Sequence, residues 1–467
     1  MLRGNKKKDP IMRKRIVPTY AVLLAGGVGA RLWPVSREMF PKQLVRFFGN
    51  RSLIQETVTR LEPVVDLNRL RVVCGELHFN ETTKQIEQMG IKARKKIICE
   101  PCGRNTAPAI LLSILTILEK ETDAVICIFP ADHVIKNHGR FNQNVMSAIE
   151  LARQGYIVTF GIEPHYPETG YGYIEGGRPV AGKAVAIRRF VEKPDRKSAG
   201  RYIRTGHFFW NSGMFAFKGS VMIEEFRVHQ PEMFFLMNRF LKETRDQRAA
   251  IYSEIPNISI DYAIMEKTDK GVVLPSDFGW SDIGSWKSLF DFLSKNKDGN
   301  VITGDVLARE TRGCLVMGEG KLVVTNNIAD MVVIGTDDSV FVSDLENSRD
   351  VKSIYKHLQQ TGRREYRRHA TESFPWGTRT TLEEQIGYRL ERLDIIPGKI
   401  CRLNQENTSV KSLMVIDGAA VVTLGKNERI VLNKGGSKTF QKKGSVKIQN
   451  TKSEMLHLIE ISLSDNS

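Results

Sequence analysis

The first residues suited to chemistry form a glycine-rich stretch, Leu24-Ala-Gly-Gly-Val-Gly-Ala-Arg-Leu-Trp-Pro34, with Pro41-Lys42-Gln43 close behind it. Glycine has no side chain, so its backbone can approach a triphosphate and hold phosphate oxygens through amide N–H groups. Fixed cations beside such a loop neutralise a departing pyrophosphate. The residues that could do this are three glycines and two cations: Gly26, Gly27, Gly29, Arg31 and Lys42. A structural glycine turn is the alternative, and the nearby cations disfavour it. The dinucleotide fingerprint fits poorly, since Leu32 stands where it requires glycine or alanine.

Two acidic residues follow in separate motifs. Asp132 lies in Phe129-Pro-Ala-Asp-His133, just past an apolar run, and Asp282 lies in Trp280-Ser-Asp-Ile-Gly-Ser-Trp286. Mg²⁺ usually takes one or two carboxylates together with phosphate oxygens and water, so these two acids suffice as its protein ligands. A helix cap is the alternative reading of Asp132. His133 is expected to be structural, because Mg²⁺ prefers oxygen ligands.

Three further polar motifs suit a sugar phosphate. They are Thr169-Gly-Tyr-Gly-Tyr173, Glu192-Lys193-Pro194 and Trp210-Asn-Ser-Gly213. Each alone fits a solvated turn equally well, and their occurrence together favours a site. Together they offer a flexible loop with a stackable ring, an acid for hydroxyl groups, a cation for phosphate and an amide. The predicted sugar-phosphate contacts are Gly172, Tyr173, Glu192, Lys193 and Asn211.

Alternating strands and helices must position these residues. Continuous apolar runs at 20–25, 70–74 and 125–129 predict buried strands, and Thr106 to Leu118 predicts a helix between two of them. Ser52 is expected to cap another helix at its N-terminus. Buried strands separated by helices indicate a mainly parallel sheet covered on both faces, whose ligands bind at the carboxyl ends of the strands. The glycine loop and Asp132 both fall at such ends.

Composition excludes several classes of protein. The chain has 467 residues, enough for two or three domains, and no apolar run long enough to span a membrane. Its net charge is +16, but the first fifteen residues carry seven basic residues against one acid and so supply +6 of it. We read that segment as a solvated basic tail and expect neither a nucleic-acid nor a membrane partner. The six cysteines show no framework of paired spacings, and Cys99-Glu-Pro-Cys102 is read as a coincidental C-x-x-C. No signal-peptide pattern follows the basic N-terminus, so a cytoplasmic enzyme is expected.

The ordered motifs resemble those of the bacterial mannose-1-phosphate guanylyltransferases, including long forms with a cupin-type mannose-6-phosphate isomerase domain. The matching stretches run in family order: LAGGVGARLWPVSR with PKQ, EPCGRNTAPAI, FPADHVI, TGYGYIE, FVEKPD, WNSGMF, SIDYAIMEKTD and FGWSDIGSW. The resemblance implies that GTP and mannose 1-phosphate are the small-molecule partners and that Mg²⁺, held by Asp132 and Asp282, is the cofactor. It places the catalytic role on Arg31, Lys42, Asp132 and Asp282. The implied nucleotide contacts are the glycine loop, the cations and a later motif: Leu24, Ala25, Gly26, Gly27, Gly29, Arg31, Lys42, Arg104, Asn105 and Thr106.

The resemblance also implies a fold and its divisions. We expect an α/β protein with a Rossmann-like nucleotidyltransferase domain over 19–295, after a disordered tail over 1–18. A short β-rich, β-helix-like segment with a closing helix would follow over 296–360. A basic linker over 361–371 would lead to a small all-β, cupin-like domain over 372–467. A homo-oligomer is compatible with the sequence.

The cupin-like domain departs from the family pattern. Where active members place metal-binding histidines and a glutamate, counting from Gly398 reaches Glu406, Asn407, Thr408 and Lys411, and a later histidine position holds Val446. A lysine repels a cation, and asparagine and threonine replace imidazole poorly. We therefore expect an isomerase domain that has lost its metal and its activity.

The expected reaction is attack of a mannose 1-phosphate oxygen on the α-phosphorus of GTP, giving GDP-mannose and pyrophosphate. The nucleophile is already anionic, so no protein base is required, and catalysis is positioning plus charge neutralisation. Three alternatives remain: a nucleotidyltransferase for another sugar 1-phosphate or base, a bifunctional enzyme with isomerase activity, and a non-catalytic sensor or nucleic-acid binder.

Overall fold

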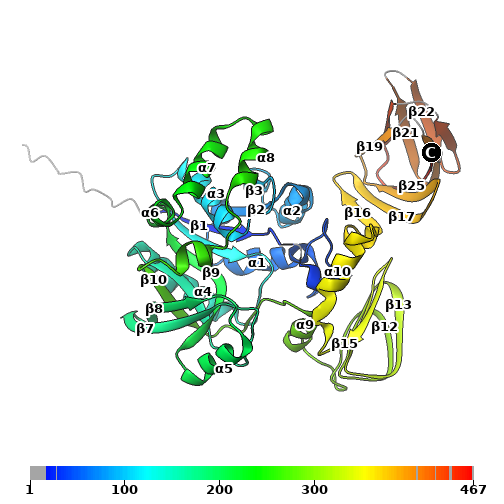
Figure 1. Cartoon of the computed structure of the whole chain (residues 1–467). Helices are drawn as coiled ribbons and strands as arrows, with labels where there is room; N and C mark the ends of the chain where they lie inside the picture. The colour runs from blue at the N-terminus through cyan, green and yellow to red at the C-terminus, as the bar shows by residue number, and fades with distance from the viewer. Residues whose placement is uncertain (1–16, 28, 406–408, 426–427, 441–443, 465–467) are drawn as a thin grey trace, which may run out of the picture.

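The computed structural model describes residues 17–464 except 28, 406–408, 426–427 and 441–443. Three parts follow one another along the chain (Figure 1): a large α/β part, a narrow β-rich part closed by a helix, and a small β-barrel at the C-terminal end. Nearly all of the predicted basic tail lies outside the described residues. No helix in the described ranges is long and apolar enough to cross a membrane.

A nine-stranded sheet forms the centre of the α/β part, in the order β3-β2-β1-β4-β9-β6-β10-β8-β7. Its strands are β1 (Thr19–Leu24), β2 (Leu70–Gly75), β3 (Ile97–Glu100), β4 (Val125–Pro130), β6 (Ile157–Ile162), β7 (Tyr173–Ala181), β8 (Ala184–Val191), β9 (Phe208–Lys218) and β10 (Gly271–Ser276). The half containing β1 to β4 is parallel, as predicted. The other half is mixed: β10 runs parallel to β6, but β9 runs antiparallel to β4 and β6, and β7 and β8 form an antiparallel hairpin. The tight turn between β7 and β8 leaves no room for the crossover that parallel strands need.

Helices cover both faces of this sheet, as the continuous apolar runs predict. One face packs against α1 (Leu53–Leu61), α2 (Phe79–Glu87) and α4 (His138–Arg153). The other packs against α3 (Thr106–Leu118), α6 (Gly219–His229), α7 (Pro231–Lys242) and α8 (Arg245–Glu254). Two further helices, α5 (Arg196–Thr205) and α9 (Trp286–Phe292), complete this part.

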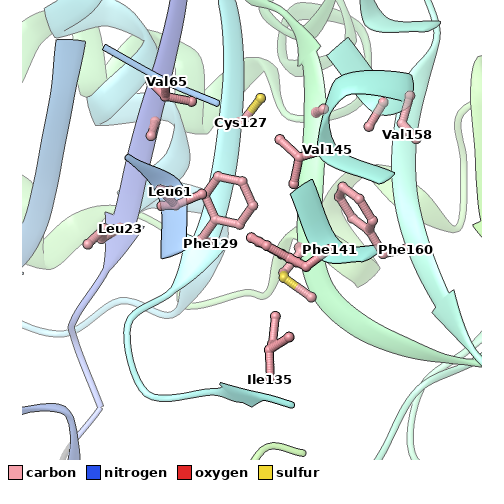
Figure 2. Close-up of a cluster of buried hydrophobic side chains, with 14 of the residues drawn as sticks. Leu23, Leu61, Val65, Cys127, Phe129, Ile135, Phe141, Val145, Val158 and Phe160 are labelled. Carbon is pink, nitrogen blue, oxygen red and sulfur yellow. The ribbon is translucent and has the colours of Figure 1, made fainter. Parts of the chain in front are cut away.

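Strand residues alternate between the two cores. In β4, Cys127 and Phe129 enter the first core, whereas Ile126 and Ile128 enter the second. Figure 2 shows the first core, where Phe129 from the sheet lies near Phe141 of α4, with ring centroids 5.9 Å apart. Because β4 is buried on both faces, packing fixes its position in the sheet. That in turn fixes the position of Asp132, two residues after the strand ends.

The predicted helix starts are confirmed. Ser52 precedes α1 in a capping box with Gln55, whose side chain accepts a hydrogen bond from the Ser52 amide at 3.0 Å. The helix predicted over 106–118 begins and ends at those residues.

The β-rich part stacks β12 (Val301–Arg312), β13 (Leu315–Ala329) and β14 (Met331–Gly335) in parallel, with β15 (Val340–Asp344) antiparallel at the edge. Val301, Leu315 and Val332 lie side by side in this stack, and all three are buried. Successive turns of chain thus place like residues over one another, as expected for a β-helix-like segment. Helix α10 (Val351–Gln360) closes it.

The C-terminal barrel consists of two facing sheets. The larger has the order β16-β17-β18-β25-β20-β23, and the smaller β19-β24-β21-β22. Their bounds are β16 (Thr371–Phe374), β17 (Gly377–Gln385), β18 (Tyr388–Ile395), β19 (Ile400–Gln405), β20 (Ser409–Asp417), β21 (Ala419–Leu424), β22 (Glu428–Asn433), β23 (Ser437–Phe440), β24 (Gly444–Asn450) and β25 (Leu456–Ser464).

Candidate active site

The glycine loop leaves the sheet where the strand order reverses. Strand β1 lies between β2 and β4, so the loop after β1 opens into the crevice at the carboxyl ends of parallel strands. Gly29 adopts φ 69°, and a Cβ there would come within 2.4 Å of the Lys42 Cβ. Gly29 therefore allows the turn and also makes room for the Lys42 side chain.

Lys42 lies at the centre of the site. Its side chain is only 6% exposed, and its Nζ donates to Asp132 Oδ2 at 2.9 Å and to the main-chain carbonyl of Asp282. Burial opposes ionisation of Asp132, but the charge of Lys42 outweighs it, so the Asp132 pKa lies below its usual value. The sequence did not predict that Lys42 would be buried. At neutral pH the two groups form a preorganised ion pair at the floor of the site.

A small strand pairing brings the second acid to the first. Strand β11 (Trp280–Ser281) pairs with β5 (Val134–Ile135), so Asp282 leaves its strand close to Asp132. Asp282 Oδ1 accepts hydrogen bonds from the Tyr171 hydroxyl at 2.6 Å and the Gly284 amide at 3.0 Å. Both acids line one cavity of about 270 Å³ that also contains Gly29, Arg31 and Lys42.

The donor set in this cavity fits Mg²⁺. Asp132 and Asp282 supply hard carboxylate oxygens on one wall, and the Asp132 side chain is 33% exposed. The ammonium of Lys42 already contacts both acidic residues, which shows that this position favours positive charge. Two carboxylates leave the remaining positions to phosphate and water, as Mg²⁺ usually requires.

A second cavity of about 410 Å³ opens behind the glycine loop. Its wall gathers eight of the predicted residues: Leu24, Ala25, Gly26, Gly27, Arg104, Asn105, Thr106 and Asp132. Thr106 begins α3, so the N-terminus of this helix, where the helix dipole favours negative charge, lies at the cavity. The Arg104 guanidinium donates to the Ser253 carbonyl and so lies against α8.

Two acidic residues on this wall, Glu100 and Asp261, were not predicted as site residues, although both belong to motifs that carry the family resemblance. Glu100 is 5% exposed, and its Oε1 accepts a hydrogen bond from the Tyr252 hydroxyl at 2.6 Å. Burial raises the pKa of Glu100. Asp261 accepts from Asn211 Nδ2 at 2.9 Å, and burial together with the charge of Glu192 raises its pKa to about 7. Their only signal in the sequence was position: Glu100 is the last residue of β3, and Asp261 begins a short π-helix at Asp261–Met265.

The third cavity, of about 580 Å³, lies on the other side of Asp282. It is lined by residues that include Arg31, Tyr171, Lys193, Asp282, Ser285 and Lys287. Of the five predicted sugar-phosphate residues, only Lys193 lines it.

The prediction for Tyr173 is wrong in its physical basis. Tyr173 is completely buried and packs on Tyr202, so its ring cannot stack on a sugar. Alternation along the chain places Tyr171 at the site instead, between Trp210 and Trp280. Gly172, Glu192 and Asn211 are not on the wall of the 580 Å³ cavity but lie close together: a Cβ on Gly172 would meet Glu192 Oε2 at 2.5 Å and Asn211 Cβ at 3.4 Å.

The basic segment predicted as a linker packs against the loop that joins Arg31 to Lys42. This segment, 361–371, includes a short turn of helix at Arg364–Tyr366. Several hydrogen bonds join it to the loop, among them those from Trp33 Nε1 to Glu365 O at 2.9 Å, from Glu38 N to Tyr366 O at 3.1 Å, from Met39 N to Arg367 O at 2.8 Å and from His369 Nε2 to Val35 O at 3.0 Å.

Arg37 ties this contact to the β-helix-like part. Its side chain is fully buried, and Nη1 and Nη2 donate to Asp338 at 2.8 and 2.5 Å. It also donates to the carbonyls of Pro34 at 3.0 Å and Arg368 at 2.7 Å. Burial opposes ionisation of Asp338, but Arg37 outweighs it and lowers the Asp338 pKa. One guanidinium thus joins the α/β part, the β-helix-like part and the segment that leads to the barrel.

The barrel interior holds an ion pair at one of the expected metal positions. Lys411 Nζ lies 2.6 Å from Oε1 of Glu460, which is fully buried. Val446 is buried among apolar side chains, and His457 pairs with Asp394 at 2.7 Å. Within the described ranges, no three His, Cys, Asp or Glu residues come together as metal ligands would. The other three expected positions lie outside those ranges: Glu406, Asn407 and Thr408.

The fold and site define a nucleotidyltransferase, and family models agree. Residues 20–299 match the nucleotidyl transferase family, 304–358 match the MannoseP isomerase/GMP-like beta-helix domain, and 361–466 match the mannose-6-phosphate isomerase C-terminal family.

Whole-chain similarity makes the family specific. The mannose-1-phosphate guanylyltransferase 2 of Escherichia coli O157:H7 is 37% identical over 96% of this chain and 95% of its own length. The xanthan biosynthesis protein XanB of Xanthomonas campestris is 36% identical over 94% of both chains. A crystal structure from Thermus thermophilus, described as mannose-1-phosphate geranyltransferase, superposes with a TM-score of 0.67 at 34% identity, covering 73% of this chain and all of that one. The chain belongs to the bacterial mannose-1-phosphate guanylyltransferase family, which confirms the resemblance read from the motifs.

Proposed function

We propose that this protein transfers GMP from GTP to α-D-mannose 1-phosphate, giving GDP-mannose and pyrophosphate, with Mg²⁺ as cofactor. The observation that carries the proposal is the arrangement of the three cavities around two acids. Asp132 lines both the 410 Å³ and the 270 Å³ cavities, and Asp282 lines both the 270 Å³ and the 580 Å³ cavities. A nucleotide in the 410 Å³ cavity and a sugar phosphate in the 580 Å³ cavity would therefore meet at the acids and Lys42.

In the proposed reaction, a phosphate oxygen of mannose 1-phosphate bonds to the α-phosphorus of GTP. The bond from that phosphorus to the bridging oxygen breaks, and pyrophosphate leaves with the electron pair. Lys42 and the loop amides are fixed before the reaction, so they stabilise developing charge without reorganising. Bound at Asp132 and Asp282, Mg²⁺ would neutralise charge on the reacting phosphates.

No proton transfer by the protein is needed, and the histidine nearest the acids supports this view. Burial lowers the pKa of His133 to about 4, so its ring is neutral at pH 7. Its Nδ1 accepts a hydrogen bond from Trp280 Nε1 at 3.1 Å, which leaves it in a structural role.

Glu100 is our candidate for selecting guanine. A carboxylate can accept hydrogen bonds from both N1–H and the 2-amino group of guanine, whereas adenine presents an acceptor at N1. Tyr252 holds Glu100 Oε1, and a Cβ on Gly26 would lie 3.5 Å from Oε2, which places that oxygen at the glycine loop. We expect Glu100→Gln to lower kcat/KM for GTP by roughly 10-fold or more, because a site that hydrogen-bonds its substrate discriminates through those bonds. Equal activity of the variant and the wild type with GTP would exclude Glu100 from base readout.

Pyrophosphate release tests the whole proposal. Purified protein is assayed with each of four nucleoside triphosphates and a panel of sugar 1-phosphates, in Mg²⁺ and in chelator. Turnover restricted to GTP with mannose 1-phosphate supports the proposal. Robust release with another pair, and none with this one, would retain the class and overturn the substrates.

For the C-terminal barrel we propose that isomerase activity is absent, because Lys411 and Glu460 pair inside it. The relative named for xanthan biosynthesis favours a role in supplying polysaccharide synthesis, and we propose the cytoplasm as the compartment.

A further inference from the structure

A lysine from outside the nucleotidyltransferase domain lines the central cavity. Lys352 is the second residue of α10, which closes the β-helix-like part (Figure 1). Helix α10 packs on the turn at Ala30–Leu32 that follows the glycine loop. Lys352 thereby joins Gly29, Arg31, Lys42 and the two acids on the wall of the 270 Å³ cavity.

The charge of Lys352 is not used elsewhere in the described part of the chain. The Lys42 ammonium pairs with Asp132, but no hydrogen bond or ion pair joins Lys352 or Arg31 to another described residue. Nor does the helix explain the lysine: a cation in the first turn opposes the helix dipole, which favours negative charge there. Two unpaired cations thus face a cavity whose acids are already partly neutralised.

We propose that Lys352 binds the pyrophosphate portion of the nucleoside triphosphate, and the pyrophosphate product, opposite the glycine loop. This proposal rests on the nucleotidyltransferase function. The cavities identify the ligand group: Lys352 is on the wall of neither the 410 Å³ cavity nor the 580 Å³ cavity, where base and sugar would lie. Only the phosphates between them reach the central cavity. The C-terminal part of the chain therefore completes the phosphate site.

Binding of inorganic pyrophosphate to the full chain in Mg²⁺, followed by calorimetry, tests this directly. We expect Lys352→Ala to weaken pyrophosphate binding about 10-fold, or about 1.4 kcal/mol, and to raise KM for the triphosphate similarly. Lys352→Arg should stay within about 3-fold of wild type, because it keeps the charge. KM for the sugar phosphate should not change. Lys356→Ala is the matched control, since Lys356 is exposed one turn further along α10 and lines none of the three cavities.

Three results would overturn the proposal: wild-type pyrophosphate affinity in Lys352→Ala, an equal loss in Lys356→Ala, or no pyrophosphate binding by the wild type. The test is separable from the choice of substrates. If the wild type fails to turn over GTP with mannose 1-phosphate, yet Lys352→Ala still loses pyrophosphate affinity, the proposed substrates fail and the role of Lys352 holds.

Discussion

Replacing Arg37 with methionine should both destabilise the protein and impair catalysis. Methionine roughly keeps the length of the side chain but removes a buried cation with bonds of 2.8 and 2.5 Å to Asp338. It also leaves the carbonyls of Pro34 and Arg368 without the donor they have now. Breaking a buried ion pair costs about 3–5 kcal/mol, because the remaining charge is uncompensated. Asp338 is 17% exposed, so we expect the lower end of that range.

At about 2–4 °C per kcal/mol for domains of this size, the apparent Tm should fall by roughly 6–12 °C at pH 7. Asp338→Asn in the same background removes the orphaned charge, so the double variant should melt above Arg37→Met alone. This rescue separates an ion pair from simple packing.

Catalysis provides the second readout. Arg37 lies on the loop between Arg31 and Lys42, and a displacement of about 1 Å at a reacting group can cost about 100-fold in rate. We expect kcat of Arg37→Met to fall at least about 10-fold at a temperature well below its melt. An unchanged Tm would refute the assigned energetics. A lowered Tm with wild-type kcat would show that the contact stabilises the fold without positioning the loop.

Three further expectations concern other sites. Lys42→Ala and Asp282→Ala should each lower kcat/KM by roughly 100-fold or more, and near-normal turnover in a well-folded variant would show that the residue is misplaced in our mechanism. Burial, followed by the charge of Arg37, lowers the pKa of His369 to about 4, below the value of about 6.5 expected when unfolded. The unfolded chain then binds more protons than the folded chain between about pH 4 and 6.5. The contribution of His369 to the free energy of unfolding is therefore fully present above about pH 6.5 and is lost as the pH falls through that window. His369→Gln should flatten the dependence of Tm on pH from 7.5 to 4.5, and an unaltered slope would exclude His369 as a source. The full chain should not interconvert mannose 6-phosphate and fructose 6-phosphate in a coupled assay, with or without added Zn²⁺, because Lys411 occupies one of the expected metal positions. Measurable turnover would contradict the proposal that the barrel is inactive.

The sequence determined the local structure because local rules decide it. The apolar run before the glycine loop could only be a buried strand, and the capping signal at Ser52 starts α1 where predicted. Gly29 and Lys42 were recognisable because phosphate binding needs those residue types within one short stretch. The same applies to Asp132, since an acid just past a buried parallel strand must lie at the carboxyl edge of the sheet.

Only the tertiary structure decided which distant residues share a wall. Whether Tyr171 or Tyr173 faces the site depends on which face of the sheet edge is covered, and that depends on packing against Tyr202. Spacing in sequence says nothing of the contact between Arg37 and Asp338, 301 residues apart, because their proximity follows from how three parts of the chain dock. The position of Lys352 on the wall of the 270 Å³ cavity has the same origin. The residue type is fixed by the sequence, but the packing beneath α10 decides where the helix places that side chain.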